Sequence, residues 1–332
     1  MERLSTRILG QHAETLRGSL RRHLWPSPAL GFRNALYVYQ SPGASAAARV
    51  PLVCLLRGHE REFVHLREDG SRFRTTIEMI EADVLAGTLP PLVAVMPGLN
   101  TADNTIPSLG VDMAGTWPAR AHGLGTGRYW QYLAEELLPS VELHYPETQG
   151  GQRLVAGFSL GGYTAGLLAA KKPGLFDHVA AYDGLHMWAG LRDPRTPDRP
   201  LSDRVWTTHP IFDAAFGSPR NEATMHRFNP TDVFAHARGD GSALHAPPLP
   251  PRTATHTTTH STTHHVPTYH IASAAHDGMR GNRDRNLHFV DHLKRAGCSL
   301  SFNHVIYHPD AAHTWHWMDR FTRDVLREAL AV

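Results

Sequence analysis

The chain has 332 residues, of which 41% are hydrophobic, enough to build one large α/β domain or two small ones. Its 33 basic and 31 acidic side chains nearly balance and the arginines are spread along the sequence, so a nucleic-acid partner is not expected. The two cysteines, Cys54 and Cys298, are too few and too far apart for a disulfide framework or a cysteine metal site. The N-terminus lacks the apolar core of a signal peptide and no apolar run reaches about 20 residues, so we expect a soluble cytoplasmic protein without a membrane partner.

The first third of the chain alternates between apolar strands and helices. Residues 32–40 and 50–56 are predicted strands, and the second is nearly all apolar, as expected for a central strand buried on both faces. Thr75 and Thr76 begin a helical pattern that ends at Ala86, before Gly87, and residues 92–96 form a further buried strand. After a loop region over 100–127, apolar spacing predicts a helix over 128–141.

Residues 153–162 are the most informative stretch, because an apolar run ends in the pattern G-x-S-x-G-G. This pattern predicts a strand, a sharp turn at Ser159 and a helix, the arrangement known as the nucleophile elbow. Gly157 and Gly161 remove side chains that would collide at such a turn. An Ala-rich helical segment follows and closes at Pro173-Gly174, so Ser159 also stands at a helix N-terminus, where negative charge is favoured.

The rest of the chain contains further strand and helix units and two irregular stretches. Strands are predicted over 178–182, 268–272 and 300–307, and helices over 284–296 and 315–330. Between these, residues 185–235 resemble a lid or wall over a pocket. The His-, Thr- and Pro-rich residues 238–267 lack apolar periodicity and are predicted to be a flexible insertion. Alternating units with buried strands predict a single α/β domain with a doubly wound, mostly parallel sheet and helices on both faces.

A serine hydroxyl is a weak nucleophile, so Ser159 needs a histidine base and an acid that orients the histidine. In α/β-hydrolases the acid follows the serine in the chain and the histidine comes last, before the final helix. Asp277 follows the strand 268–272 and is the first choice for the acid. Asp183, at the end of the strand after the elbow helix, is the alternative, and Asp284 is third because it also fits a helix cap.

Position selects the base among 24 histidines. His313 lies in the loop between the last predicted strand and the C-terminal helix, and His308 and His316 are its competitors. The tetrahedral intermediate needs two backbone N–H donors. Leu160, after the nucleophile, and His59, after Gly58, are predicted to supply them.

Several blocks together resemble the putative-esterase group of α/β-hydrolases, which includes enterochelin-esterase-like, esterase D-like and mycolyltransferase-like enzymes. The matching blocks are Leu52 to His59, Glu136-Leu137-Leu138-Pro139, the G-x-S-x-G-G elbow with its Ala-rich helix, Asn286-Leu287 through Leu293 to Gly297, and His313 with Trp315. The resemblance implies an α/β-hydrolase fold and hydrolysis of small carboxylic esters through an acyl-enzyme on Ser159, with His313 as base and Asp277 as acid. The chain departs from the group at Arg57, where a His or Asp often stands, and in a longer spacing from Asp277 to Asn286.

Three alternatives remain at this level. An acyltransferase would use the same residues, because an alcohol can replace water as acceptor. His256, His260, His264, His265 and His270 are spaced closely enough to capture a metal ion, although carboxylates and thiols are absent from the segment. A hydrolase fold without activity could serve as a binding module. The sequence shows no Gly-rich nucleotide fingerprint, so no cofactor is expected, and it leaves the oligomeric state open.

Overall fold

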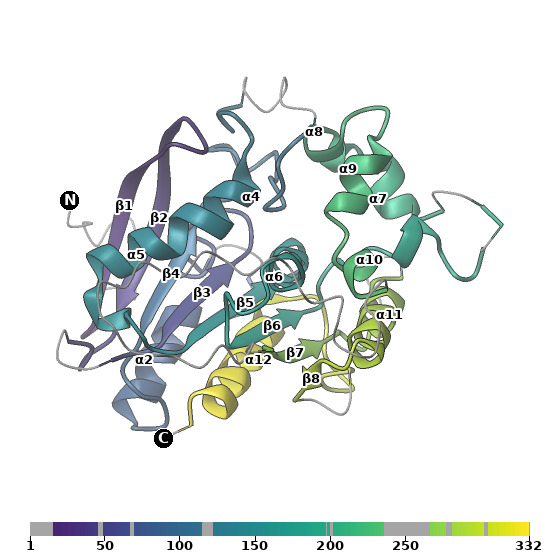
Figure 1. Cartoon of the computed structure of the whole chain (residues 1–332). Helices are drawn as coiled ribbons and strands as arrows, with labels where there is room; N and C mark the ends of the chain where they lie inside the picture. Colours follow the sequence, from purple (N-terminus) through teal and green to yellow (C-terminus); the bar gives the residue numbers. More distant parts are fainter. Residues whose placement is uncertain are drawn as a thin grey trace, which may run out of the picture.

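A computed structural model describes residues 16–45, 49–66, 70–114, 122–196, 198–199, 202–235, 266–276, 281–301 and 305–331. Its centre is an eight-stranded sheet with the order β1-β2-β4-β3-β5-β6-β7-β8 (Figure 1). The strands are β1 (Ser19–Ser27), β2 (Phe32–Gln40), β3 (Leu52–Leu56), β4 (Val93–Pro97), β5 (Arg153–Phe158), β6 (His178–Tyr182), β7 (Thr268–Ala272) and β8 (Ser299–Leu300). β1, β2 and β4 pair antiparallel, and the strands from β4 through β3 to β8 run parallel.

The predicted strands from β2 to β7 are confirmed, and two details differ. β1 was not predicted, because its residues mix polar and apolar side chains on an edge strand that is only partly buried. The strand predicted over 300–307 is wrong: β8 ends at Leu300, and Ile306 forms only an isolated bridge with Ser273. An edge strand has a partner on one side only, so apolar composition alone did not fix its length.

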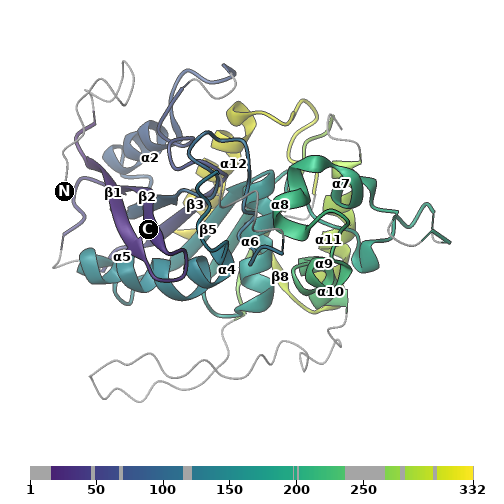
Figure 2. The ribbon, with the colours of Figure 1, turned by 90° about the horizontal axis from the view of Figure 1, so that it is seen from above.

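Helices cover both faces of the sheet, as predicted. The longer ones are α2 (Thr76–Leu85), α4 (Tyr129–Gln131) continued by the π-helix η2 (Tyr132–Leu137) and by α5 (Leu138–His144), α6 (Leu160–Lys171), α11 (Asn282–Arg295) and α12 (Trp315–Ala329). Figure 2 shows α2 and α12 on one side of the strands and α4 and α5 on the other. Of the helices in the described part, none is long and apolar enough to cross a bilayer.

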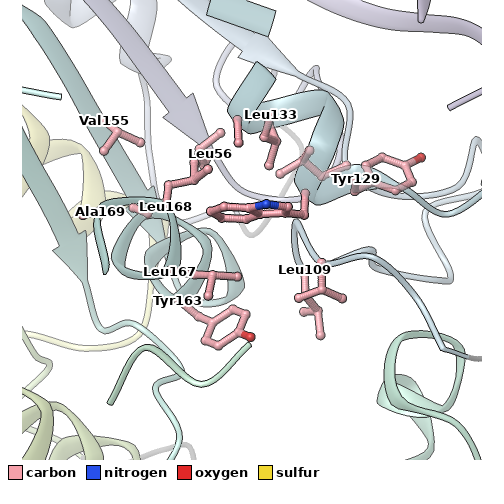
Figure 3. Close-up of a cluster of buried hydrophobic side chains, with 14 of the residues drawn as sticks. Leu56, Leu109, Tyr129, Leu133, Val155, Tyr163, Leu167, Leu168 and Ala169 are labelled. Carbon is pink, nitrogen blue, oxygen red and sulfur yellow. The ribbon is translucent and has the colours of Figure 1, made fainter. Parts of the chain in front are cut away.

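Alternate residues of each central strand face opposite helical layers, which gives the sheet two cores. Cys54 and Leu56 of β3 belong to the core beneath α6, whereas Val53 and Leu55 pack in the core with α2 and α12. Figure 3 shows part of the first core, where Leu56 and Val155 of the sheet lie near Leu133, Leu167 and Leu168 of the helices. Because the side chains of β3 alternate between the two cores, neither face of this strand is exposed.

Local sequence signals fix where the helices begin. Thr75 accepts a hydrogen bond from Glu78 N (3.2 Å), and the Glu78 carboxylate accepts one from Thr75 N (2.6 Å), a complete capping box for α2. The helix predicted over 128–141 is also confirmed, although its middle turns are the π-helix η2.

The described residues between 185 and 235 form short helices beside α6 and α11. They are η4 (Ala189–Leu191), α7 (Arg204–Thr208), η5 (Pro210–Phe212), α8 (Asp213–Phe216), α9 (Glu222–Arg227) and α10 (Pro230–Ala235), and one further short helix, η3 (Pro146–Thr148), precedes β5. Figure 1 shows α7, α8 and α9 together at the end of the molecule toward which the arrows of β6 and β7 point. Of the flexible insertion predicted over 238–267, all but the last two residues lie outside the described part.

A buried carboxylate joins α2 to the C-terminal helix. Asp83 is 1% exposed, and its two oxygens accept hydrogen bonds from Arg323 (2.6 and 2.7 Å) and Arg327 (2.8 and 3.1 Å). Burial by itself would raise the pKa of Asp83, but the hydrogen bonds from the two arginines outweigh it and leave the pKa below its ordinary value. A carboxylate with a lowered pKa stabilises the fold above its unfolded pKa of about 3.9 and loses that stabilisation as the pH falls through the folded value.

Replacing Asp83 by Asn is therefore expected to lower the free energy of unfolding at pH 7 by about 2 kcal/mol, because two charge-assisted pairs are lost and both arginines are partly solvated. The difference from wild type should shrink as the pH is lowered from about 4 to 3. Urea unfolding over this pH range measures it, with Asp291→Asn on the exposed face of α11 as control. A loss of equal size at every pH would show that the charge of Asp83 contributes nothing.

Candidate active site

Ser159 occupies the turn between β5 and α6. Its backbone has φ 56° and ψ −114°, a strained conformation for a residue with a side chain. The Ser159 N–H donates to Tyr182 O (3.1 Å), and the Ser159 carbonyl accepts from Leu185 N (3.0 Å). Both bonds connect the turn to the end of β6, so the strained conformation is held by the neighbouring strand.

Two glycines make this turn possible. A Cβ at Gly161 would lie 1.8 Å from the carbonyl oxygen of Leu56, at the end of β3. A Cβ at Gly157 would lie 2.1 Å from the carbonyl oxygen of Gly161. In both cases the obstacle is backbone, which cannot rotate away as a side chain can, so the pattern G-x-S-x-G is a steric requirement of this packing.

Asp183 follows β6 directly and presents its carboxylate to a histidine. Its Oδ2 lies 2.5 Å from His313 Nδ1, and its Oδ1 accepts from Ser273 Oγ (3.0 Å) and Ala274 N (3.3 Å). Asp183 is 3% exposed and has φ 45°. Because an ionised carboxylate only accepts hydrogen bonds, this contact places the proton of His313 on Nδ1 and leaves Nε2 as the basic nitrogen.

His313 reaches this position from the loop before α12. Its ring packs on Phe158, the residue before Ser159, with ring centroids 4.6 Å apart. Tyr182 Oη donates to the carbonyl of Ala312 (2.7 Å) and so ties the loop to the end of β6. Since β5 and β6 are neighbours in the sheet, their carboxyl ends bring Ser159, Asp183 and His313 into one small region.

The other candidates for the acid and the base have other contacts, are exposed, or lie outside the described residues. Asp284 pairs with Arg195 (3.3 Å) in the first turn of α11. His308 stacks on Trp317, and the side chain of His316 is exposed. Asp277, the first choice for the acid, lies outside the described residues, so its role stays a prediction. Within the described part, Asp183 is the carboxylate that bonds to His313.

Two buried asparagines support the turn that carries Asp183. Asn282 Nδ2 donates to Asp183 O (3.0 Å), and Asn286 Nδ2 donates to Gly184 O (2.8 Å). The exposed fractions of the two side chains are 1% and 0%. Neither residue was predicted to belong to the site; the spacing of four between two asparagines at the start of a helix was the available signal, since it puts both amides on one face.

His186, which follows Asp183 closely in the chain, is not a competing base. It is fully buried, it stacks on Phe289 with ring centroids 3.9 Å apart, and its ring nitrogens have no hydrogen-bond partner among the described residues. Burial lowers the pKa of His186 to about 3. The ring is therefore neutral at physiological pH and serves as packing behind the turn at Gly184.

The N–H groups of the two predicted oxyanion donors differ in whether they are already hydrogen-bonded. Leu160 begins α6, and its N–H belongs to the first turn, whose donors have no partner within the helix. The N–H of His59 donates to Glu62 Oε2 (2.6 Å), and so does the N–H of Gly58 (2.8 Å). In this structure the amide of His59 is thus engaged by a carboxylate, and it becomes a donor to another oxygen only when Glu62 moves away.

Three aromatic residues of the 185–235 region are packed in the interior. Trp188, Trp206 and Phe212 are each 3% exposed or less, and Trp206 stacks on Phe212 with ring centroids 4.4 Å apart. Trp206 and Phe212 belong to the core beneath α6, and Trp188 lies edge-on to His288 of α11.

The metal hypothesis rested on five histidines. His270 lies 3.2 Å from His178 and 2.6 Å from Ser301, and no cluster of three metal-ligating side chains occurs in the described part. His256, His260, His264 and His265 lie outside the described residues.

Comparisons with known proteins identify the family and the fold. The family model described as Putative esterase matches residues 27–236, and no curated protein sequence matches the chain. Solved structures share the fold at low identity. They include an S-formylglutathione hydrolase from Agrobacterium tumefaciens (TM-score 0.59, 18% identity, 95% of each chain covered) and the fluorophosphonate-binding serine hydrolase F of Staphylococcus aureus (0.59, 16%, 95% of this chain and 99% of that one). A ferulic acid esterase from Anaeromyces mucronatus is a third (0.56, 13%, 98% and 95%).

The sheet with helices on both faces is thus an α/β-hydrolase fold. Since the family model covers more than half of its residues, the chain belongs to the putative-esterase family.

Proposed function

We propose that this protein hydrolyses carboxylic esters of small molecules through an acyl-enzyme on Ser159. The observation that supports it most is the hydrogen bond between Asp183 and His313 Nδ1, beside a serine in a strained turn at the end of the adjacent strand. A base with a fixed tautomer next to a serine in a strained turn is the arrangement that nucleophilic acyl transfer requires.

In the first half of the reaction, His313 Nε2 takes the proton of Ser159 Oγ as that oxygen bonds to the ester carbonyl carbon. The carbonyl oxygen becomes an oxyanion, which the N–H of Leu160 stabilises together with the positive end of α6. The protonated His313 then donates its proton to the leaving alkoxide as the ester C–O bond breaks, and an alcohol departs.

In the second half, water attacks the acyl-enzyme. His313 removes a proton from the water, a second tetrahedral intermediate forms, and its collapse returns the proton to Ser159 Oγ and releases the carboxylic acid. Asp183 stabilises the imidazolium in both halves without taking the proton. His59 is proposed as the second oxyanion donor, in a state in which its N–H has left Glu62.

We assign the acid to Asp183 rather than Asp277. The Nδ1 of His313 carries one hydrogen and already has Asp183 Oδ2 at 2.5 Å, so it offers no second bond to another carboxylate. Ser273, Ala274 and Asn282 also hold Asp183 in this orientation, as expected for a group that must stay in place through the reaction.

Labelling with a fluorophosphonate tests the proposal. The purified protein is expected to form one covalent adduct, mapped to Ser159 by mass spectrometry, and Ser159→Ala should form none. Ser41→Ala, which changes a buried serine that accepts a hydrogen bond from Leu92 N just before β4, is the matched serine control and should still be labelled. A folded wild-type sample that does not react, or an adduct on a different residue, would contradict the proposed nucleophile.

A further inference from the structure

Arg57 directly follows β3 and lies against the serine turn. A Cβ at Gly161 would be 2.8 Å from Arg57 Cα, so the two backbones are in contact. The Arg57 guanidinium carbon lies 5.2 Å from the centroid of the Phe158 ring, the same ring on which His313 packs at 4.6 Å. The guanidinium of Arg57 and the imidazole of His313 thus pack on the same aromatic ring. This ring belongs to Phe158, the residue before Ser159.

Arg57 is partly buried and has no carboxylate partner among the described residues, unlike the buried arginines Arg72 and Arg285. Its Nε is buried and without a hydrogen-bond partner, and it forms no ion pair with any described residue. Arg72 is paired with Asp319 (3.3 Å) and Arg285 with Asp203 (2.8 Å). Withdrawing part of a guanidinium from water without compensation costs free energy, so an unpaired group at this position needs an explanation.

The carboxylates of the loop after Arg57 and of the proposed acid are bonded to other groups. Glu60 lies 3.1 Å from Arg22 Nη2 and 2.7 Å from His59 Nδ1. Glu62 accepts from the amides of Gly58 and His59, and Asp183 bonds to His313. No described acidic side chain forms an ion pair with Arg57, so its charge is available to an incoming molecule.

We propose that Arg57 binds an anionic group of the substrate, so that this enzyme prefers esters that carry a carboxylate. The proposal rests on the proposed ester hydrolysis at Ser159 and names the substrate class. The edge of the planar guanidinium can donate two parallel hydrogen bonds to a carboxylate while one of its faces stays on Phe158. A bound carboxylate forms the ion pair that Arg57 lacks among the described residues, and it lies beside the nucleophile Ser159.

Matched ester pairs test this preference. Mono-4-nitrophenyl adipate is compared with 4-nitrophenyl hexanoate, which place a carboxylate or a methyl group at the end of the acyl chain. 4-Acetoxybenzoate is compared with its methyl ester, which places the charge on the alcohol part. The quantity compared is the kcat/KM of the charged ester divided by the kcat/KM of the neutral ester. For at least one pair, this ratio should fall about 10- to 100-fold in Arg57→Gln, mainly because KM for the charged ester rises, and it should partly recover in Arg57→Lys.

Controls separate this proposal from the proposed function. Arg61→Gln removes an exposed arginine of the same loop and should leave the ratio unchanged. Fluorophosphonate labelling of Ser159 should be intact in Arg57→Gln, and free adipate should slow the labelling of wild type but not of this variant. Unchanged ratios in both pairs, or equal losses for charged and neutral esters, overturn the role of Arg57. Loss of labelling in wild type overturns the ester hydrolysis itself.

Discussion

Replacing Asp183 by Asn is expected to lower kcat by about 10⁴-fold and to change KM little. The Asp183 carboxylate accepts the Nδ1 proton of His313 and stabilises the imidazolium that forms when Ser159 is deprotonated. An amide of the same shape carries no charge, and its NH₂ group favours the other tautomer of the ring, in which Nε2 holds the proton and cannot act as base. Steady-state hydrolysis of a 4-nitrophenyl ester measures the effect.

Asp277→Asn is the matched comparison, since it changes the other candidate acid in the same way. Its kcat is expected to stay within a few-fold of wild type. Thermal unfolding of both variants checks that the effect is catalytic, because Asn retains the bonds that Ser273 and Asn282 make at this turn more closely than any other residue. A large loss in Asp277→Asn together with a small one in Asp183→Asn would reassign the acid to Asp277.

Replacing Gly161 by Ala is expected to destabilise the fold by more than about 4 kcal/mol, near the upper end for single substitutions. The new methyl group would lie 1.8 Å from Leu56 O, so α6 would have to separate from β3 at the centre of the sheet. Urea unfolding or, where the variant does not fold, the yield of soluble protein measures the loss.

Gly166→Ala provides the control for Gly161→Ala within the same helix. Its Cβ would meet side-chain atoms of His186 and Phe289 at 3.1 and 3.3 Å, contacts that small adjustments relieve. The gain in helix propensity, about 1 kcal/mol, should offset most of the cost. If the midpoint of urea unfolding is the same for Gly161→Ala and for wild type, the close approach of α6 to β3 is not a requirement of the fold.

The central elements of this protein were predictable because their signals are local. β3, with five consecutive buried apolar residues, and the helix that begins at a Thr75–Glu78 capping box both follow from short patterns. The elbow is equally local, since strand, Ser159 and helix are contiguous and the glycines are required by contacts within a few residues and with one neighbouring strand. The length of β8 was not predictable, because it depends on pairing with β7 alone.

The sequence by itself determined the α/β class, the nucleophile candidate Ser159 and the loop that carries His313, because chain order and local pattern are enough for each. Only the tertiary structure decided which described carboxylate meets His313, since that depends on β6 lying next to β5 and on the positive φ that turns Asp183 toward the ring. It also decided that the His59 amide is held by Glu62 and that Arg57 has no carboxylate partner among the described residues. These are contacts between separate segments or specific side-chain orientations, and a hydrogen bond or an ion pair depends on positions in space that a one-dimensional pattern does not contain.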